Sequence, residues 1–210
     1  MPVYRKASEA EGGMDLSRED QHLLDLLVST GAIFRDGHYV YKSGRHGSVY
    51  IEKDRILANT SVTSKLCYRI AKQFFRANVQ VVAGPSMGGA TMAQWVAYFL
   101  EPMPFAVYAE DEGGHKVFRR VFAELIPGKR VLVVDDVVDT GGSAARVIKT
   151  VEQLEGTVVG VGSLWNRGDV SFGNYPLYCL ANTFYQTYTS ADCPLCREGI
   201  PLVDVGSLVR

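Results

Sequence analysis

The stretch "VLVVDDVVDTGGS", residues 131–143, runs from four apolar residues into two adjacent aspartates and ends in "DTGGS". The apolar run predicts a buried strand, and the following "SAARVIKTVEQL", residues 143–154, predicts a helix. A turn of small and hydroxyl-bearing residues directly before a helix offers backbone N–H groups and hydroxyls to an anion. The stretch therefore predicts a phosphate site at a helix N-terminus, with two carboxylates beside it.

The rest of the chain repeats this alternation of strand and helix. Apolar, β-branched runs at 79–84, 105–110, 130–136 and 158–165 predict strands, and helices are expected at about 61–75, 89–100 and 143–154. Nearer the start, Ser17 can cap a helix that Gly31 would end. Continuous apolar strands alternating with helices predict an α/β fold with a central, mainly parallel sheet flanked by helices.

Composition narrows the class of protein. The chain has 210 residues, 47% of them hydrophobic, and a net charge of -1, which argues against a nucleic-acid partner. No run of eighteen apolar residues occurs, so we expect a cytoplasmic protein with no membrane partner. Four cysteines are too few for a disulfide scaffold. We expect a flexible tail over residues 1–15 and a single domain over 16–210.

Ligands of such sheets bind at the carboxyl ends of the strands. Three turns are expected there: "AGPSMGG" (83–89), "AEDEGGHK" (109–116) and "DDVVDTGGS" (135–143). Asp135 and Asp136 can accept hydrogen bonds from hydroxyls or face a divalent cation. A phosphate next to a vicinal diol describes a ribose 5-phosphate. The alternative is a plain capping turn, which needs only one acidic residue. The phosphate would be bound by Asp139, Thr140, Gly141, Gly142 and Ser143.

This turn resembles the 5-phosphoribosyl 1-diphosphate (PRPP) motif of type I phosphoribosyltransferases. Within that group the chain is similar to orotate phosphoribosyltransferases, on "YKSGRHGSVYI" (41–51), "VVAGPSMGGATMAQWVAY" (81–98), "NRG" (166–168) and "CPLCREGIPL" (193–202). The resemblance implies the type I phosphoribosyltransferase fold with a small N-terminal hood. It also implies transfer of the phosphoribosyl group of PRPP to orotate, giving orotidine 5-monophosphate and diphosphate in pyrimidine biosynthesis.

The resemblance assigns roles to further residues. Orotate is a planar anion, for which an arginine fork is suited, and Arg167 takes that role with Lys42 and Tyr50 nearby. Two departures from the family concern the diphosphate. Gly88 stands where many orotate enzymes have a lysine, and the mobile loop is short and acidic. The residues that the resemblance places at the diphosphate turn are Ser86, Met87, Gly88 and Gly89. We expect Gly88 and Gly89 to use backbone conformations closed to other residues.

Catalysis is expected to rest on Lys116, with His115 second, and on Asp136. The resemblance implies Mg²⁺, bound mainly through PRPP, and a homodimer in which the loop reaches the partner's site. Two alternatives stay open: a phosphoribosyltransferase for another base, and a PRPP-binding regulatory protein.

The role of Cys193 and Cys196, in "CPLC", stays open at this point. One C-x-x-C pair supplies two ligands where structural zinc takes four, and His22, His38 and His46 have no spacing that suggests a ligand set. The sequence therefore disfavours zinc.

Overall fold

The computed structural model describes residues 25–41, 44–166, 170–182 and 186–203. The predicted tail over 1–15 and most of the helix expected after Ser17 lie outside these residues, so the domain limits stay predictions. Residues 25–29 are helical, and Gly31 follows in the left-handed region with φ +66°. The predicted end of that helix is confirmed.

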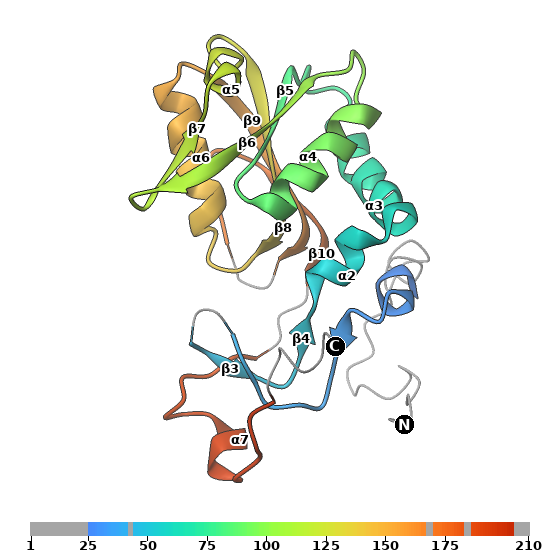
Figure 1. The fold of residues 1–210 in the computed structure, drawn as a ribbon, viewed down its shortest axis with the longest axis vertical. Coiled ribbons are helices and arrows are strands. Elements are labelled where there is room, and N and C mark those ends of the chain that lie inside the picture. Colours follow the sequence, from blue (N-terminus) through green and yellow to red (C-terminus); the bar gives the residue numbers. More distant parts are fainter. Residues whose placement is uncertain (1–24, 42–43, 167–169, 183–185, 204–210) are drawn as a thin grey trace.

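The main body is a six-stranded sheet with helices on both faces (Figure 1). The strand order is β10-β9-β8-β5-β6-β7, and every neighbouring pair is parallel except β6 and β7. The strands of this sheet are β5 (Val81–Gly84), β6 (Phe105–Glu112), β7 (His115–Phe118), β8 (Arg130–Val138), β9 (Thr157–Asn166) and β10 (Leu177–Asn182). The predicted central, mainly parallel sheet is confirmed.

Helices cover the sheet because its middle strands are apolar on both faces. Leu132 and Val134 of β8 pack in one hydrophobic cluster, and their neighbours Val131 and Val133 pack in the other. The first cluster includes residues of α3 and α4, and the second includes residues of α6. The helices of the body are α2 (Lys53–Ala58), α3 (Thr60–Gln73), α4 (Met87–Phe99), α5 (Val121–Glu124) and α6 (Gly142–Gln153).

The turn expected at residues 109–116 has a different form from the other two. β6 continues beyond the end of β5 and returns through Gly113 and Gly114 as the antiparallel strand β7. Strands β7 and β10 and the short helix α2 were not among the elements expected from the sequence. β7 is only four residues long and polar at its start, so it carries little periodic signal.

A small lobe lies below the body in Figure 1 and joins both ends of the described chain. It contains short strand pairs, and main-chain hydrogen bonds link His46 to Tyr188 and Val203 to His38. The implied N-terminal hood is therefore completed by C-terminal residues. The elements of this lobe are β1 (Ile33–Phe34), β2 (Tyr39–Val40), β3 (His46–Gly47), β4 (Tyr50–Ile51) and α7 (Pro194–Arg197).

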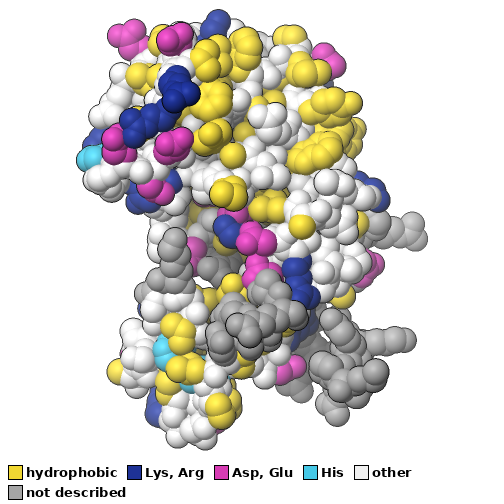
Figure 2. Space-filling model, viewed as in Figure 1, with side chains coloured by type: hydrophobic (Ala, Val, Ile, Leu, Met, Phe, Trp, Pro, Cys, Tyr) yellow, Lys and Arg dark blue, Asp and Glu magenta, His cyan; other side chains and the backbone are white. Residues whose placement is uncertain are grey.

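Figure 2 shows a narrow waist between body and lobe, with acidic and basic side chains gathered at it.

Candidate active site

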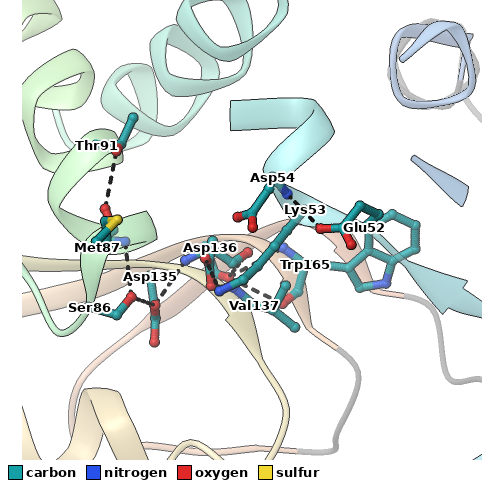
Figure 3. Close-up of polar contacts among 12 residues, drawn as sticks. Glu52, Lys53, Asp54, Ser86, Met87, Thr91, Asp135, Asp136, Val137 and Trp165 are labelled. Carbon is teal, nitrogen blue, oxygen red and sulfur yellow. Dashed lines mark hydrogen bonds and ion pairs between the residues drawn. The ribbon is translucent and has the colours of Figure 1, made fainter. Parts of the chain in front are cut away.

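The acidic pair lies buried near the end of β8, close to this waist. Asp135 and Asp136 are only 5% and 3% exposed. Asp135 Oδ1 accepts hydrogen bonds from the Asp136 N–H at 3.0 Å and the Ser86 hydroxyl at 3.4 Å. Asp136 Oδ1 accepts from the Val137 N–H at 2.7 Å (Figure 3). Each carboxylate is thus fixed by the backbone of its own strand and has further lone pairs that a ligand's hydroxyls can use.

Lys53 is the residue at this site that sequence reasoning missed. It begins α2, and its Nζ lies 2.6 Å from Asp136 Oδ2. Burial opposes the charged form, but the hydrogen bond to Asp136 and the nearby negative charges outweigh it and raise the pKa of Lys53. The two residues are 83 positions apart, so no local pattern links them.

The Asp135 carboxyl is in a different electrostatic state. Burial is the main reason why its pKa lies above the usual range, and the negative charge of Asp136 adds to the effect. A backbone hydrogen bond from Asp136 and the charges of Lys53 and Lys116 act in the opposite direction. A ligand that supplies positive charge or hydrogen-bond donors here would favour the ionised form of Asp135.

The turn at residues 84–89 brings α4 close to the acidic pair. Ser86 caps α4 by accepting a hydrogen bond from the Gly89 N–H at 3.2 Å. A Cβ atom on Gly88 would lie 1.9 Å from Asp136 Oδ2. Any side chain at position 88 would therefore collide with Asp136. The positive charge beside Asp136 comes from Lys53 and not from a lysine at position 88.

One reason given for the glycine pair was wrong. Gly88 and Gly89 were expected to use backbone conformations closed to other residues, but both lie in α4 without a positive φ. Space is the actual constraint, since a Cβ on Gly89 would come within 2.9 Å of the Val134 carbonyl oxygen.

The turn that follows β8 has the form expected of an anion site. Gly141 is the N-cap of α6 with φ +73°, a left-handed conformation that favours glycine. No side chain of the described residues caps this helix, whereas Ser86 caps α4. The first-turn N–H groups of α6 are therefore available to a phosphate. Asp139 and Thr140 lie just before this turn of the chain, and Gly142 and Ser143 begin α6; their contact with a phosphate stays a prediction.

Of the three residues assigned to the base, only Tyr50 is described. It lies on β4, half-buried, with its ring 5.7 Å from that of Tyr39 and 6.4 Å from that of Phe34. Lys42 and Arg167 lie outside the described residues. Tyr50 belongs to the small lobe, which meets the body at the waist (Figure 1).

Two basic residues at the β6–β7 hairpin, Lys116 and Arg119, pair with acids of β6. Lys116 is 3% exposed, and its Nζ lies 2.8 Å from Asp111 Oδ2. Arg119 pairs with Glu112 at 2.9 Å, and His115 is exposed. Lys116 is close enough to Asp135 for its charge to lower the pKa of that carboxyl. For Lys116 to contact a diphosphate, its pairing with Asp111 would have to change.

The small lobe holds a second polar group, which sequence reasoning also missed. His38, His46, Cys193 and Cys196 each direct a ligand atom toward the others, all within 4.8 Å. The expectation that the histidine spacing suggests no ligand set was wrong for His38 and His46, because their cysteine partners lie about 150 positions away. His22 lies outside the described residues.

The fold and the acidic turn together define a class of protein. A parallel sheet that carries a carboxylate pair and an uncapped helix N-terminus at the carboxyl ends of its strands is the arrangement of a phosphoribosyltransferase. We call this edge of the sheet, with Asp135, Asp136 and the turn into α6, the rim. In agreement, residues 54–171 match the family model described as "Phosphoribosyl transferase domain".

Individual relatives narrow the class. An orotate phosphoribosyltransferase of Desulforamulus reducens is 39% identical over 91% of this chain and 98% of its own. An orotate phosphoribosyltransferase of Thermotoga maritima is 37% identical over 87% of this chain and 96% of its own. The crystal structure of orotate phosphoribosyltransferase from Aeropyrum pernix has a TM-score of 0.63 at 30% identity, covering 76% of this chain and 93% of that one. This chain belongs to the orotate phosphoribosyltransferase family.

None of the helices in the described part of the chain has the length and apolar character needed to cross a membrane.

Proposed function

We propose that this protein transfers the 5-phosphoribosyl group of PRPP to orotate. The C1–O bond to diphosphate breaks, a bond from C1 to N1 of orotate forms, and orotidine 5-monophosphate and diphosphate leave. The observation that carries the proposal is the acidic pair beside the uncapped N-terminus of α6. Membership of the orotate phosphoribosyltransferase family supplies the choice of base.

The rim would bind PRPP through two sets of contacts. Asp135 and Asp136 accept hydrogen bonds from the ribose hydroxyls, and their fixed orientation means that little freedom is lost on binding. The 5-phosphate lies at the α6 N-terminus, where backbone N–H groups and the hydroxyls of Thr140 and Ser143 can donate to it. Lys53 keeps Asp136 in place, so we infer that it is a positioning residue.

The small lobe would supply the pocket for the base. Tyr50 gives a flat aromatic surface, and we assign Arg167 to the orotate carboxylate with Lys42 nearby. Because the lobe and the rim face each other across the waist, orotate would lie between them, close to C1 of the ribose. Orotate loses its N1 proton readily, so the mechanism needs no dedicated histidine base.

Positive charge develops on the ribose ring as the C1–O bond breaks, while negative charge grows on the diphosphate. Donors that are already oriented stabilise such charge without reorganisation. The Ser86 to Gly89 turn and Lys116 would serve the leaving group, with His115 as the second cation. Lys116 is a candidate because it is buried beside the rim and already balances negative charge there.

Magnesium fits this site as a partner of the substrate. Among the described residues, no group of three carboxylates or histidines gathers at the rim, and the Asp136 oxygen that faces Lys53 is already engaged. We propose that Mg²⁺ is bound mainly by PRPP oxygens and water, with Asp135 and Asp136 nearby. When bound, it would offset negative charge on the diphosphate.

We also propose a cytoplasmic homodimer. Large apolar side chains of α3, α4 and β6 are exposed, as expected for a surface that a second copy covers. They include Tyr68, Tyr98 and Phe105. The β6–β7 hairpin would then be able to reach the neighbouring site.

A panel of bases tests the proposal. The protein is incubated with PRPP, Mg²⁺ and orotate, uracil, adenine or hypoxanthine, and diphosphate release is followed. We expect release with orotate and little with the others. Preference for another base would leave the rim assignment intact and overturn the base assignment. PRPP binding without release would indicate a regulatory protein.

A further inference from the structure

The His and Cys side chains of the small lobe meet more closely than their positions in the sequence suggest. His38 Nε2 lies 3.0 Å from His46 Nδ1, 3.5 Å from Cys193 Sγ and 3.6 Å from Cys196 Sγ. Cys196 Sγ lies 3.3 Å from His46 Nδ1. Four atoms that can each donate a lone pair thus converge on one point.

Hydrogen bonding alone does not account for this convergence. His38 Nδ1 lies 2.7 Å from the Ile200 carbonyl oxygen, which can only accept, so Nδ1 carries the proton. In the neutral ring, Nε2 therefore has one lone pair and no hydrogen. One lone pair cannot serve three neighbours at 3.0 to 3.6 Å equally, whereas a cation at their centre would satisfy all of them.

The distances match the geometry of a tetrahedral zinc site. With Zn–N of about 2.0 Å and Zn–S of about 2.3 Å, ligand atoms are about 3.3 Å apart for two nitrogens and about 3.5 Å for nitrogen and sulfur. The observed values are 3.0 Å between the nitrogens and 3.3, 3.5 and 3.6 Å for three of the four nitrogen–sulfur pairs, and all four ligand atoms lie within 4.8 Å of one another. We propose that His38, His46, Cys193 and Cys196 bind one zinc ion.

The ligand chemistry and surroundings favour a structural ion. Two thiolates balance the charge of Zn²⁺, so the site can be buried at low cost, and His38, His46 and Cys193 are buried. The hydrogen bond from His38 to the Ile200 carbonyl fixes the ring, as partners of zinc-bound histidines commonly do. Four protein ligands leave no open position for a substrate.

The proposed ion would join the two ends of the chain. His38 and His46 belong to the β2–β3 region. Cys193 is the N-cap of α7, and Cys196 lies in that helix. Strands of two residues and a four-residue helix bury little apolar surface, so they are marginal without another link. Zinc would thus hold the lobe that carries Tyr50 in its shape.

The site is independent of the proposed transferase activity because none of its ligands lies at the acidic rim. The experiment can therefore be carried out without substrate. Full-length protein is purified under reducing conditions, and its metal content is measured by mass spectrometry. We expect about one zinc ion per chain. Cobalt added to metal-free protein should give the intense visible absorption of a tetrahedral S₂N₂ site.

Variants assign the ligands. Cys196→Ser, at the most exposed ligand, and His46→Ala should lower zinc content to background. The matched control Cys179→Ala removes a buried thiol outside the cluster and should keep the ion. If Cys196→Ser does not fold, release of zinc from wild type by a thiol-blocking reagent, detected with a zinc-sensitive dye, gives the same information.

Three results would overturn the proposal. One is wild-type protein that takes up neither zinc nor cobalt after full reduction. Another is retention of the ion by well-folded Cys196→Ser and His46→Ala, which would place it elsewhere. A Cys193–Cys196 disulfide that persists when zinc and reductant are supplied would count against it equally.

Discussion

At the rim of the sheet, buried carboxylates keep lone pairs that can face a ligand, whereas in the small lobe four side chains direct their ligand atoms at one another. Asp135 and Asp136 are held by backbone N–H groups, Ser86 and Lys53. The lobe cluster instead joins segments from both ends of the chain. Buried polar groups therefore face a ligand at the rim and face one another in the small lobe. Changes at the rim should impair binding and catalysis, and changes in the lobe should first impair metal content and folding.

The largest effect should come from the rim. Asp136→Asn removes the charge that accepts hydrogen bonds from the ribose, and kcat/KM for PRPP should fall about a hundredfold. The melting temperature and zinc content should stay near wild type. Unchanged kinetics after replacement of both aspartates would show that the rim does not bind PRPP through them, and the functional difference between the two regions would be lost.

The base pocket offers the next test. Arg167→Lys keeps the charge but loses the planar fork, which contributes about 1.5 to 3 kcal/mol in a charged pair. Orotate affinity should fall roughly ten- to a hundredfold, with PRPP affinity spared. Calorimetric titration with each substrate measures both. An equal loss for the two substrates would indicate misfolding.

Lys116 tests whether the β6–β7 hairpin belongs functionally to the rim. Because it would act on charge that appears in the transition state, Lys116→Ala should lower kcat about tenfold or more and change the KM values little. His115→Ala should have a smaller effect. Full activity in Lys116→Ala would remove this residue from the mechanism.

Mixed dimers sharpen the same test. If the hairpin acts in the partner's site, mixing Lys116→Ala and Arg167→Ala subunits should restore activity, since some hybrids hold one intact site. Failure to complement, with hybrid formation verified, would place hairpin and base pocket on one chain.

Lys53 should have a moderate effect. Lys53→Met leaves Asp136 without its ion pair, and we expect KM for PRPP to rise about tenfold. Lys53→Arg keeps the positive charge and should recover most of the affinity. If Met and Arg at position 53 behave alike, the positioning role is wrong.

The smallest effect concerns stability. The raised pKa of Asp135 means that its ionised form destabilises the native state, so Asp135→Asn should stabilise the free protein while impairing PRPP binding. The gain should be absent below the ordinary carboxyl pKa, grow as pH rises from there to the raised pKa of about 7, and stay constant above it. Denaturant unfolding at a series of pH values measures the gain. A gain present only at acid pH would contradict this.

The two regions also differ in how far the sequence predicts them. The acidic turn is contiguous, so apolar periodicity, paired acids and Gly141 predicted its strand, helix and anion site together. The lobe cluster and the Lys53–Asp136 pair depend on contacts across about 150 and 83 positions, which no local pattern carries. The glycine pair at 88 and 89 was expected for its backbone freedom, whereas the constraint on it is close approach to Asp136 and Val134, which is visible only in three dimensions.

The most direct test of the rim assignment compares two sugars on two proteins. Ribose 5-phosphate and 2-deoxyribose 5-phosphate differ by one hydroxyl of the diol that Asp135 and Asp136 would bind. With Mg²⁺ present, wild type should bind the ribose compound about tenfold more tightly, and Asp136→Asn should bind both alike. Equal discrimination by wild type and variant would contradict the account, because the hydroxyl would then be recognised elsewhere.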